Sequence, residues 1–128
     1  MVLGGQSDIP KFFQILIRYI IKFLKTKMLV SIDLCIVPLG VDISIAKYVA
    51  ACQKVIQKAG LEYELGPNGT AIEGEWDEVF ACVRECHATV HSLGVNRIYT
   101  NLKVNTRIDR NQSFREKVSS VKAVLKKS

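Results

Sequence analysis

Hydrophobic and polar residues alternate along residues 30–38, so one face of this segment is apolar and the other is polar. A period of two is typical of a β-strand with one buried face. Shorter runs of the same kind predict strands over 61–65, 70–72 and 95–104. Gly74 is expected to end the strand that begins at residue 70.

Two segments between the predicted strands have a helical period instead. The apolar residues of 45–59 fall within about 120° of a helical wheel, and Gly60 follows as a stop signal. Asp42 or Ser44 is expected to cap its first turn. Residues 76–93 form the second helical pattern. A third pattern, near the carboxyl end, has four apolar residues on one side: Phe114, Val118, Val121 and Leu125.

The predicted order is β-α-β-β-α-β, which is the ferredoxin-like plan, an α+β sandwich, here with an extra C-terminal helix. Two helices on one face of a four-stranded sheet leave the other face open. Since Cys35 and Tyr99 interrupt its polar surface, we expect the open face to be an oligomer interface or a ligand platform; a solvated face is the alternative. Its predicted outward residues are Ser31, Asp33, Glu62, Glu64, Glu73, Arg97, Tyr99, Asn101 and Lys103.

The first 27 residues differ from the remainder, 28–128, which we take as the single domain. Residues 12–24 are strongly apolar, and Gln14, Arg18, Lys22 and Lys25 form one narrow polar stripe, as in a basic amphipathic helix. This run is too short to span a bilayer, which needs roughly 20 apolar residues. Three interpretations stay open: a mitochondrial targeting segment, an interfacial or partner-binding helix, and, the one we favour, translated upstream sequence before a start at Met28.

Composition excludes some classes of function. The 128 residues carry a net charge of +6, of which residues 1–27 contribute +4 and the body +2, so a nucleic-acid partner is not indicated. Four cysteines inside apolar patterns indicate reduced core thiols and an intracellular, cytoplasmic protein. No catalytic signature is visible. The string CxxxCHxxxH at 82–91 suggests zinc, but the cysteines and histidines face different directions on a helix, so we predict no metal site.

The richest stretch chemically is 66–80, GPNGTAIEGEWDEVF. Its first four residues are expected to supply left-handed and fixed-φ positions of a turn, and its acids to begin a helix. Glu73 and Trp76 would then line one pocket, where a carboxylate beside an aromatic surface suits a cationic or amino-bearing heteroaromatic ligand. A solvent-facing strand residue is the alternative role for Glu73.

Three strings resemble the YkoF-like thiamine-binding family: DLCIVPLG at 33–40, ELGPNGTAIEGEWDEVF at 64–80 and RIYTNLKVNTRIDR at 97–110. The resemblance implies a non-catalytic ferredoxin-like protein that assembles through its sheets into dimers and a tetramer and binds thiamine, or its pyrimidine part, near subunit boundaries. Where the family turns through glycine after the last strand, this chain has Asn105. The pocket motif carried over is Gly66, Thr70, Glu73, Gly74 and Trp76, with Tyr99, Asp33 and Glu64 as further candidates.

The sequence therefore predicts a non-enzymatic thiamine-binding homo-oligomer without a resident cofactor. Two other functions stay open: a structural or regulatory oligomer that binds another small molecule or an anion, and a small-molecule enzyme. The predicted location is cytoplasmic, or mitochondrial if residues 1–27 are a targeting segment.

Overall fold

The structure, a computed structural model, describes residues 9–24 and 27–128. After an N-terminal helix, α1 (Lys11–Leu24), the body contains β1 (Leu29–Leu39), α2 (Ala46–Ala59), β2 (Glu62–Leu65), β3 (Thr70–Glu75), α3 (Trp76–Ser92) and β4 (Arg97–Thr106). Helix α4 (Phe114–Lys127) follows. The sheet order is β2-β3-β1-β4 with antiparallel neighbours, which confirms the α+β, ferredoxin-like fold.

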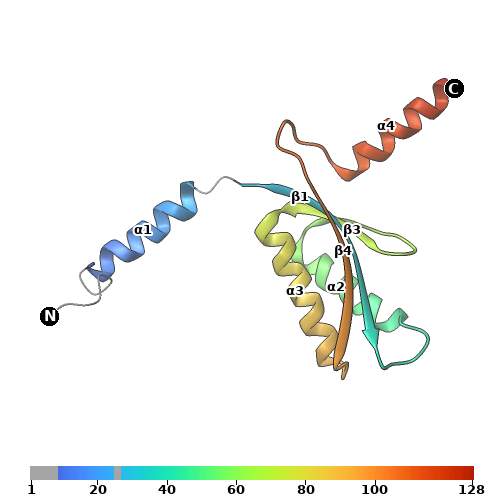
Figure 1. The fold of residues 1–128 in the computed structure, drawn as a ribbon, viewed down its shortest axis with the longest axis horizontal. Helices are drawn as coiled ribbons and strands as arrows, with labels where there is room; N and C mark the ends of the chain where they lie inside the picture. Colours follow the sequence, from blue (N-terminus) through green and yellow to red (C-terminus); the bar gives the residue numbers. More distant parts are fainter. Residues whose placement is uncertain (1–8, 25–26) are drawn as a thin grey trace.

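The core lies between the sheet and the paired helices α2 and α3, which cover one of its faces (Figure 1). Alternation in β1 buries Val30, Ile32, Leu34 and Ile36, as the period of two predicts. They pack against apolar residues of both helices, including Tyr48 and Ile56 of α2 and Val79, Cys86 and Val90 of α3. Strand register places Ser31, Glu62, Glu73 and Asn105 in one row of the opposite, open face.

Three local predictions are wrong. Gly74 does not end β3: it pairs with Val30, and the strand continues to Glu75. A Cβ atom on Gly74 would lie 2.9 Å from Leu61 Cδ2, so glycine is needed there for space. No residue of 66–69 has a positive φ. Helix α2 has Ile45 at its N-cap and no side-chain cap from Asp42 or Ser44.

Both ends of α3 follow from the sequence. The Glu75 carboxylate accepts hydrogen bonds from the backbone N–H groups of Asp77 and Glu78, so the acidic start begins the helix as predicted. At the other end, Gly94 has φ +91°. Helix α3 therefore begins directly after β3, with Glu75 as its N-cap.

Helix α4 packs on the body through its first residue. Phe114 is buried, whereas Val118, Val121 and Leu125 are 53–66% exposed. Figure 1 shows α4 directed away from the sheet after the connection that follows β4. The predicted apolar stripe is present, but beyond Phe114 it is mostly exposed within the described chain.

Candidate functional site

Two cavities lie at the two ends of the β1–β3 pairing. The first, which we call the hairpin cavity, has a volume of about 250 Å³ and lies between α2, β1 and the turn that joins β2 to β3. The second, the α4 cavity, has a volume of about 280 Å³ and lies between the sheet and the connection from β4 to α4. Both are near the lower end of the size range of small-ligand pockets, about 300 Å³.

The hairpin cavity occupies the space beside β1 where β3 has ended. Pairing of β1 with β3 stops at Leu34 and Thr70, so beyond this point β1 has a strand neighbour only on the β4 side. The turn 66–69 and helix α2 close the gap. The walls are largely apolar, with Leu34, Ile36, Ile45, Val49, Ile56, Leu65 and Pro67 among the lining residues.

A polar pair stands in these apolar walls. Gln53 Nε2 donates a hydrogen bond of 2.9 Å to Thr70 Oγ1. Thr70 is 5% exposed and is the only polar or charged residue that is buried in the described chain. The threonine hydroxyl keeps its own proton to donate, and the amide oxygen of Gln53 makes no hydrogen bond within residues 9–24 and 27–128. One donor and one acceptor are therefore adjacent at the cavity wall.

Asp33 lies against the outside of the same turn. A Cβ atom on Gly69 would lie 2.5 Å from Asp33 Oδ1, so only glycine lets the turn approach this carboxylate so closely. Gly66 N donates to Gly69 O at 2.8 Å, which closes the turn. A negative charge is thus held next to the wall of the hairpin cavity.

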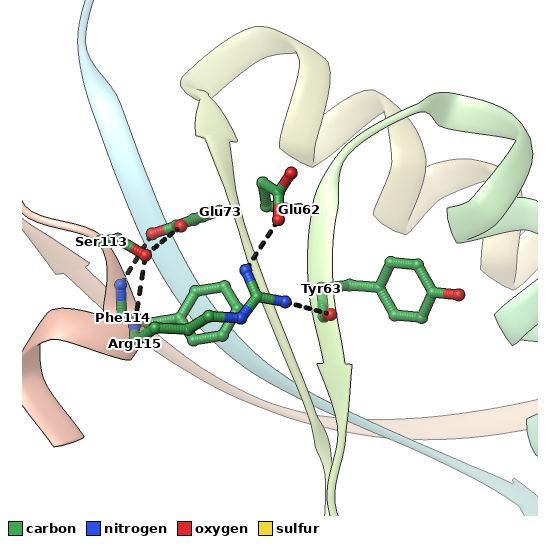
Figure 2. Close-up of polar contacts among 6 residues, drawn as sticks. All are labelled: Glu62, Tyr63, Glu73, Ser113, Phe114 and Arg115. Atoms are coloured by element: carbon green, nitrogen blue, oxygen red, sulfur yellow. Dashed lines mark hydrogen bonds and ion pairs between the residues drawn. The ribbon is translucent and has the colours of Figure 1, made fainter. Parts of the chain in front are cut away.

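The α4 cavity contains Glu73, the leading candidate from the sequence. Both carboxylate oxygens of Glu73 are engaged: Oε1 accepts from Ser113 Oγ at 2.7 Å, and Oε2 accepts from the backbone N–H of Phe114 at 2.8 Å. Figure 2 shows the carboxylate facing the start of α4. Glu73 therefore satisfies one of the free N–H groups at the N-terminus of α4.

Arg115 completes this attachment of α4. Its guanidinium donates to Glu62 Oε2 at 2.7 Å and to the carbonyl oxygen of Tyr63 at 3.2 Å, and it lies over the Phe114 ring (Figure 2). Glu62 and Glu73 are neighbours in the sheet. Two strand carboxylates thus bind the first turn of α4 to the open face.

The sequence-predicted site residues do not meet in one place. Gly66 and Thr70 line the hairpin cavity, and Glu73 and Gly74 line the α4 cavity. Trp76 lines neither; its ring packs on Phe80, 4.6 Å between centroids, at the edge of the core. The structure therefore does not bring Glu73 and Trp76 to one pocket. Tyr99 and Glu64 line neither cavity and are exposed on the open face, where Tyr99 is 63% exposed.

Gln53 was missed by the sequence reasoning. The signal that identifies it is its position: Gln53 follows Val49 by four residues and precedes Ile56 by three, so a polar amide interrupts the apolar face of α2. A polar residue in that position needs a partner inside the fold.

The four cysteines are free thiols, and Cys52, Cys82 and Cys86 are buried together between α2 and α3. Hydrogen bonding with the other two thiols, together with burial, raises the pKa of Cys86, so this thiol stays protonated. His87 Nε2 contacts Thr100 Oγ1 at 2.7 Å, and His91 Nδ1 contacts the carbonyl oxygen of Val95 at 2.7 Å. In the part of the chain that the structure describes, no group of three or more potential ligands is placed to hold a metal.

Residues 32–122 match the family described as thiamine-binding proteins. The chain belongs to this family. A relative from Synechocystis, the UPF0045 protein sll0230, is 54% identical over 101 residues, which are 79% of this chain and 84% of the relative. The UPF0045 protein ECM15 of Eremothecium gossypii is 37% identical over 101 residues, which are 78% of this chain and 96% of the relative.

Solved structures of similar proteins share the fold. MJ1052 from Methanocaldococcus jannaschii superposes with a TM-score of 0.68 at 32% identity, over 73% of this chain and 95% of that protein. TM0486 from Thermotoga maritima, provisionally assigned to thiamine biosynthesis or salvage, has a TM-score of 0.63 at 25% identity, over 73% of this chain and 98% of that protein. Gln53 and Thr70, the polar pair of the hairpin cavity, lie within the region that matches the thiamine-binding family.

Proposed function

We propose that this protein binds thiamine without chemical conversion, and that the hairpin cavity holds the aminopyrimidine ring. The observation that carries the proposal is the Gln53–Thr70 pair. An aminopyrimidine presents a ring nitrogen acceptor beside an exocyclic amino donor. Thr70 Oγ can donate to the nitrogen and Gln53 Oε1 can accept from the amino group, and a mismatched ligand would leave buried polar groups unpaired.

The rest of the cavity supports a flat ring of this kind. Apolar side chains from β1 and α2 form the walls, and few polar groups interrupt them, which is the usual composition of a small-molecule pocket. Asp33, held against Gly69, supplies negative charge on the side of the turn. In this proposal the Asp33 carboxylate compensates the positive charge of the thiazolium ring.

Glu73 has a different role in this proposal. Its carboxylate is used to attach α4, through Ser113 and Phe114. We also propose that a second copy of the chain covers the open sheet face. In the isolated chain this face leaves Tyr99 exposed and Cys35 and Val37 only half-buried. The assembly would be a dimer or a tetramer.

Calorimetric titration of the full chain with thiamine, its pyrimidine part and its thiazolium part tests the function. We expect saturable heat with thiamine and the pyrimidine part, and much weaker heat with the thiazolium part, because the donor–acceptor pair addresses the pyrimidine. No saturable binding of thiamine or the pyrimidine part would refute the proposal. Turnover of thiamine during the titration would refute its non-catalytic element.

A further inference from the structure

Helix α1 presents an apolar surface that nothing in the body covers. Eight large hydrophobic residues of this helix are 39–71% exposed: Phe12, Phe13, Ile15, Leu16, Ile17, Tyr19, Ile20 and Ile21. Figure 1 shows α1 apart from the sheet and its helices. Exposed apolar patches of this kind mark surfaces that bind a partner or a membrane.

The polar side of α1 is narrow and basic. At 100° per residue, Lys11, Gln14 and Arg18 fall within about 60° of one another, and the segment Lys11–Leu24 contains no Asp or Glu. The eight apolar residues occupy the remaining arc of about 240°. Cationic side chains at the border of a broad apolar surface match a layer of anionic headgroups above a hydrocarbon interior.

The width of the apolar arc distinguishes a lipid surface from a second helix. A partner helix covers a seam of a few positions, such as the a and d positions of a coiled coil, and would leave most of this arc in water. A bilayer surface surrounds the helix on all sides except the polar stripe. Fourteen residues extend about 21 Å, less than the roughly 30 Å hydrocarbon thickness, and no described helix is long and apolar enough to span a membrane.

We propose that α1 binds the surface of membranes that contain anionic lipids, with its axis in the membrane plane and Lys11 and Arg18 at the headgroups. The family match begins at residue 32, and both cavities lie beyond α1, so this activity is separate from the ligand site. The thiamine-binding body would then be held at a membrane by a segment of its own chain.

Flotation of the full chain with vesicles tests this proposal. We expect flotation with phosphatidylcholine vesicles that contain phosphatidylglycerol, and much less with phosphatidylcholine alone. Ile20→Asp, in the middle of the apolar arc, should lower the bound fraction at least roughly tenfold. Arg18→Glu should lower binding to the anionic vesicles about tenfold. Val121→Asp, at an exposed apolar residue of α4, is the control and should leave binding within about twofold.

Several results would overturn the proposal. One is the absence of flotation with both vesicles. Equal flotation with both would refute the role of anionic headgroups, and equal loss in Ile20→Asp and Val121→Asp would remove the assignment to α1. If light scattering instead shows self-association that Ile20→Asp abolishes, without flotation, a second copy of the chain covers α1.

Discussion

At the scale of single residues, two glycines of the segment 66–80 are required for space. The Gly69 α-carbon faces the Asp33 carboxylate, and that of Gly74 faces Leu61 and the fully buried Val79. Gly69 does not have the left-handed backbone that the sequence predicts for its turn, and Gly74 does not end β3 as the sequence predicts. Their importance depends on neighbours that are distant in the sequence, which a local pattern does not reveal.

Gly74→Ala should destabilise the fold by about 1 to 2 kcal/mol, because the added methyl group overpacks the space between β3 and α3. Its Cβ would lie 2.9 Å from Leu61 Cδ2 and 3.3 Å from Val79 Cγ2. Urea unfolding measures this cost. In a Leu61→Ala background the cost of Gly74→Ala should fall, and an unchanged cost would show that Leu61 does not cause it.

At the scale of elements, the attachment of α4 uses carboxylates that the sequence presents as ligand groups. Alternation places Glu62 and Glu73 correctly on the open face. Ser113 and Arg115 are 40 and 53 residues away from Glu73 and Glu62 in the chain, so no local pattern joins them. The sequence predicted where Glu73 lies in the sheet but not what it binds.

Glu73→Ala should loosen the first turn of α4, since the Ser113 hydroxyl and the Phe114 N–H lose their acceptor. The loss of a helix cap costs about 1 kcal/mol, so we expect hydrogen exchange of the first-turn amides to increase roughly fivefold. The control is Glu64→Ala, which removes an exposed carboxylate of β2. Exchange that rises equally in both variants would contradict the role of Glu73.

His87 connects α3 to β4 and gives the fold a pH dependence. Burial, with a smaller effect from His91, lowers the pKa of His87 below its usual 6.5. The neutral ring therefore favours the folded state, and stability is lost as pH falls through 6.5 towards the lower folded-state pKa. His87→Gln lacks this contribution, so the stability difference between the wild-type protein and His87→Gln should narrow from pH 7.5 to 5.5. Chemical unfolding at both pH values measures it; a difference that widens in acid would contradict this assignment.

At the scale of the whole molecule, the order of strands and helices is predictable because each element carries its own period and its own stop signal. The period of two in β1 and the Gly60 and Gly94 ends of the helices all agree with the structure. The candidate site is less predictable, because the hairpin cavity joins Gln53 of one element to Thr70 of another. Its existence also depends on where the β1–β3 pairing stops.

Tyr99→Asp should shift the protein towards a monomer if a second copy covers the open face. Tyr99 lies beside Val37 on that face and is 63% exposed in the isolated chain. Light scattering at micromolar concentration should give a multiple of the 14.3 kDa chain mass for the wild-type protein and a smaller mass for this variant. The control, Ile43→Asp, changes a fully exposed residue outside the sheet and should leave the mass unchanged. A monomeric wild-type protein would exclude this assembly.

The most direct test of the account compares the affinity for thiamine's pyrimidine part in Thr70→Val and Glu73→Gln, by calorimetric titration. Thr70→Val removes only the hydroxyl of the buried pair, and we predict that the Kd rises about tenfold, the value of one hydrogen bond. Glu73→Gln should leave the Kd within about twofold. A Kd that rises in Glu73→Gln and not in Thr70→Val would contradict the account and place the ligand in the α4 cavity.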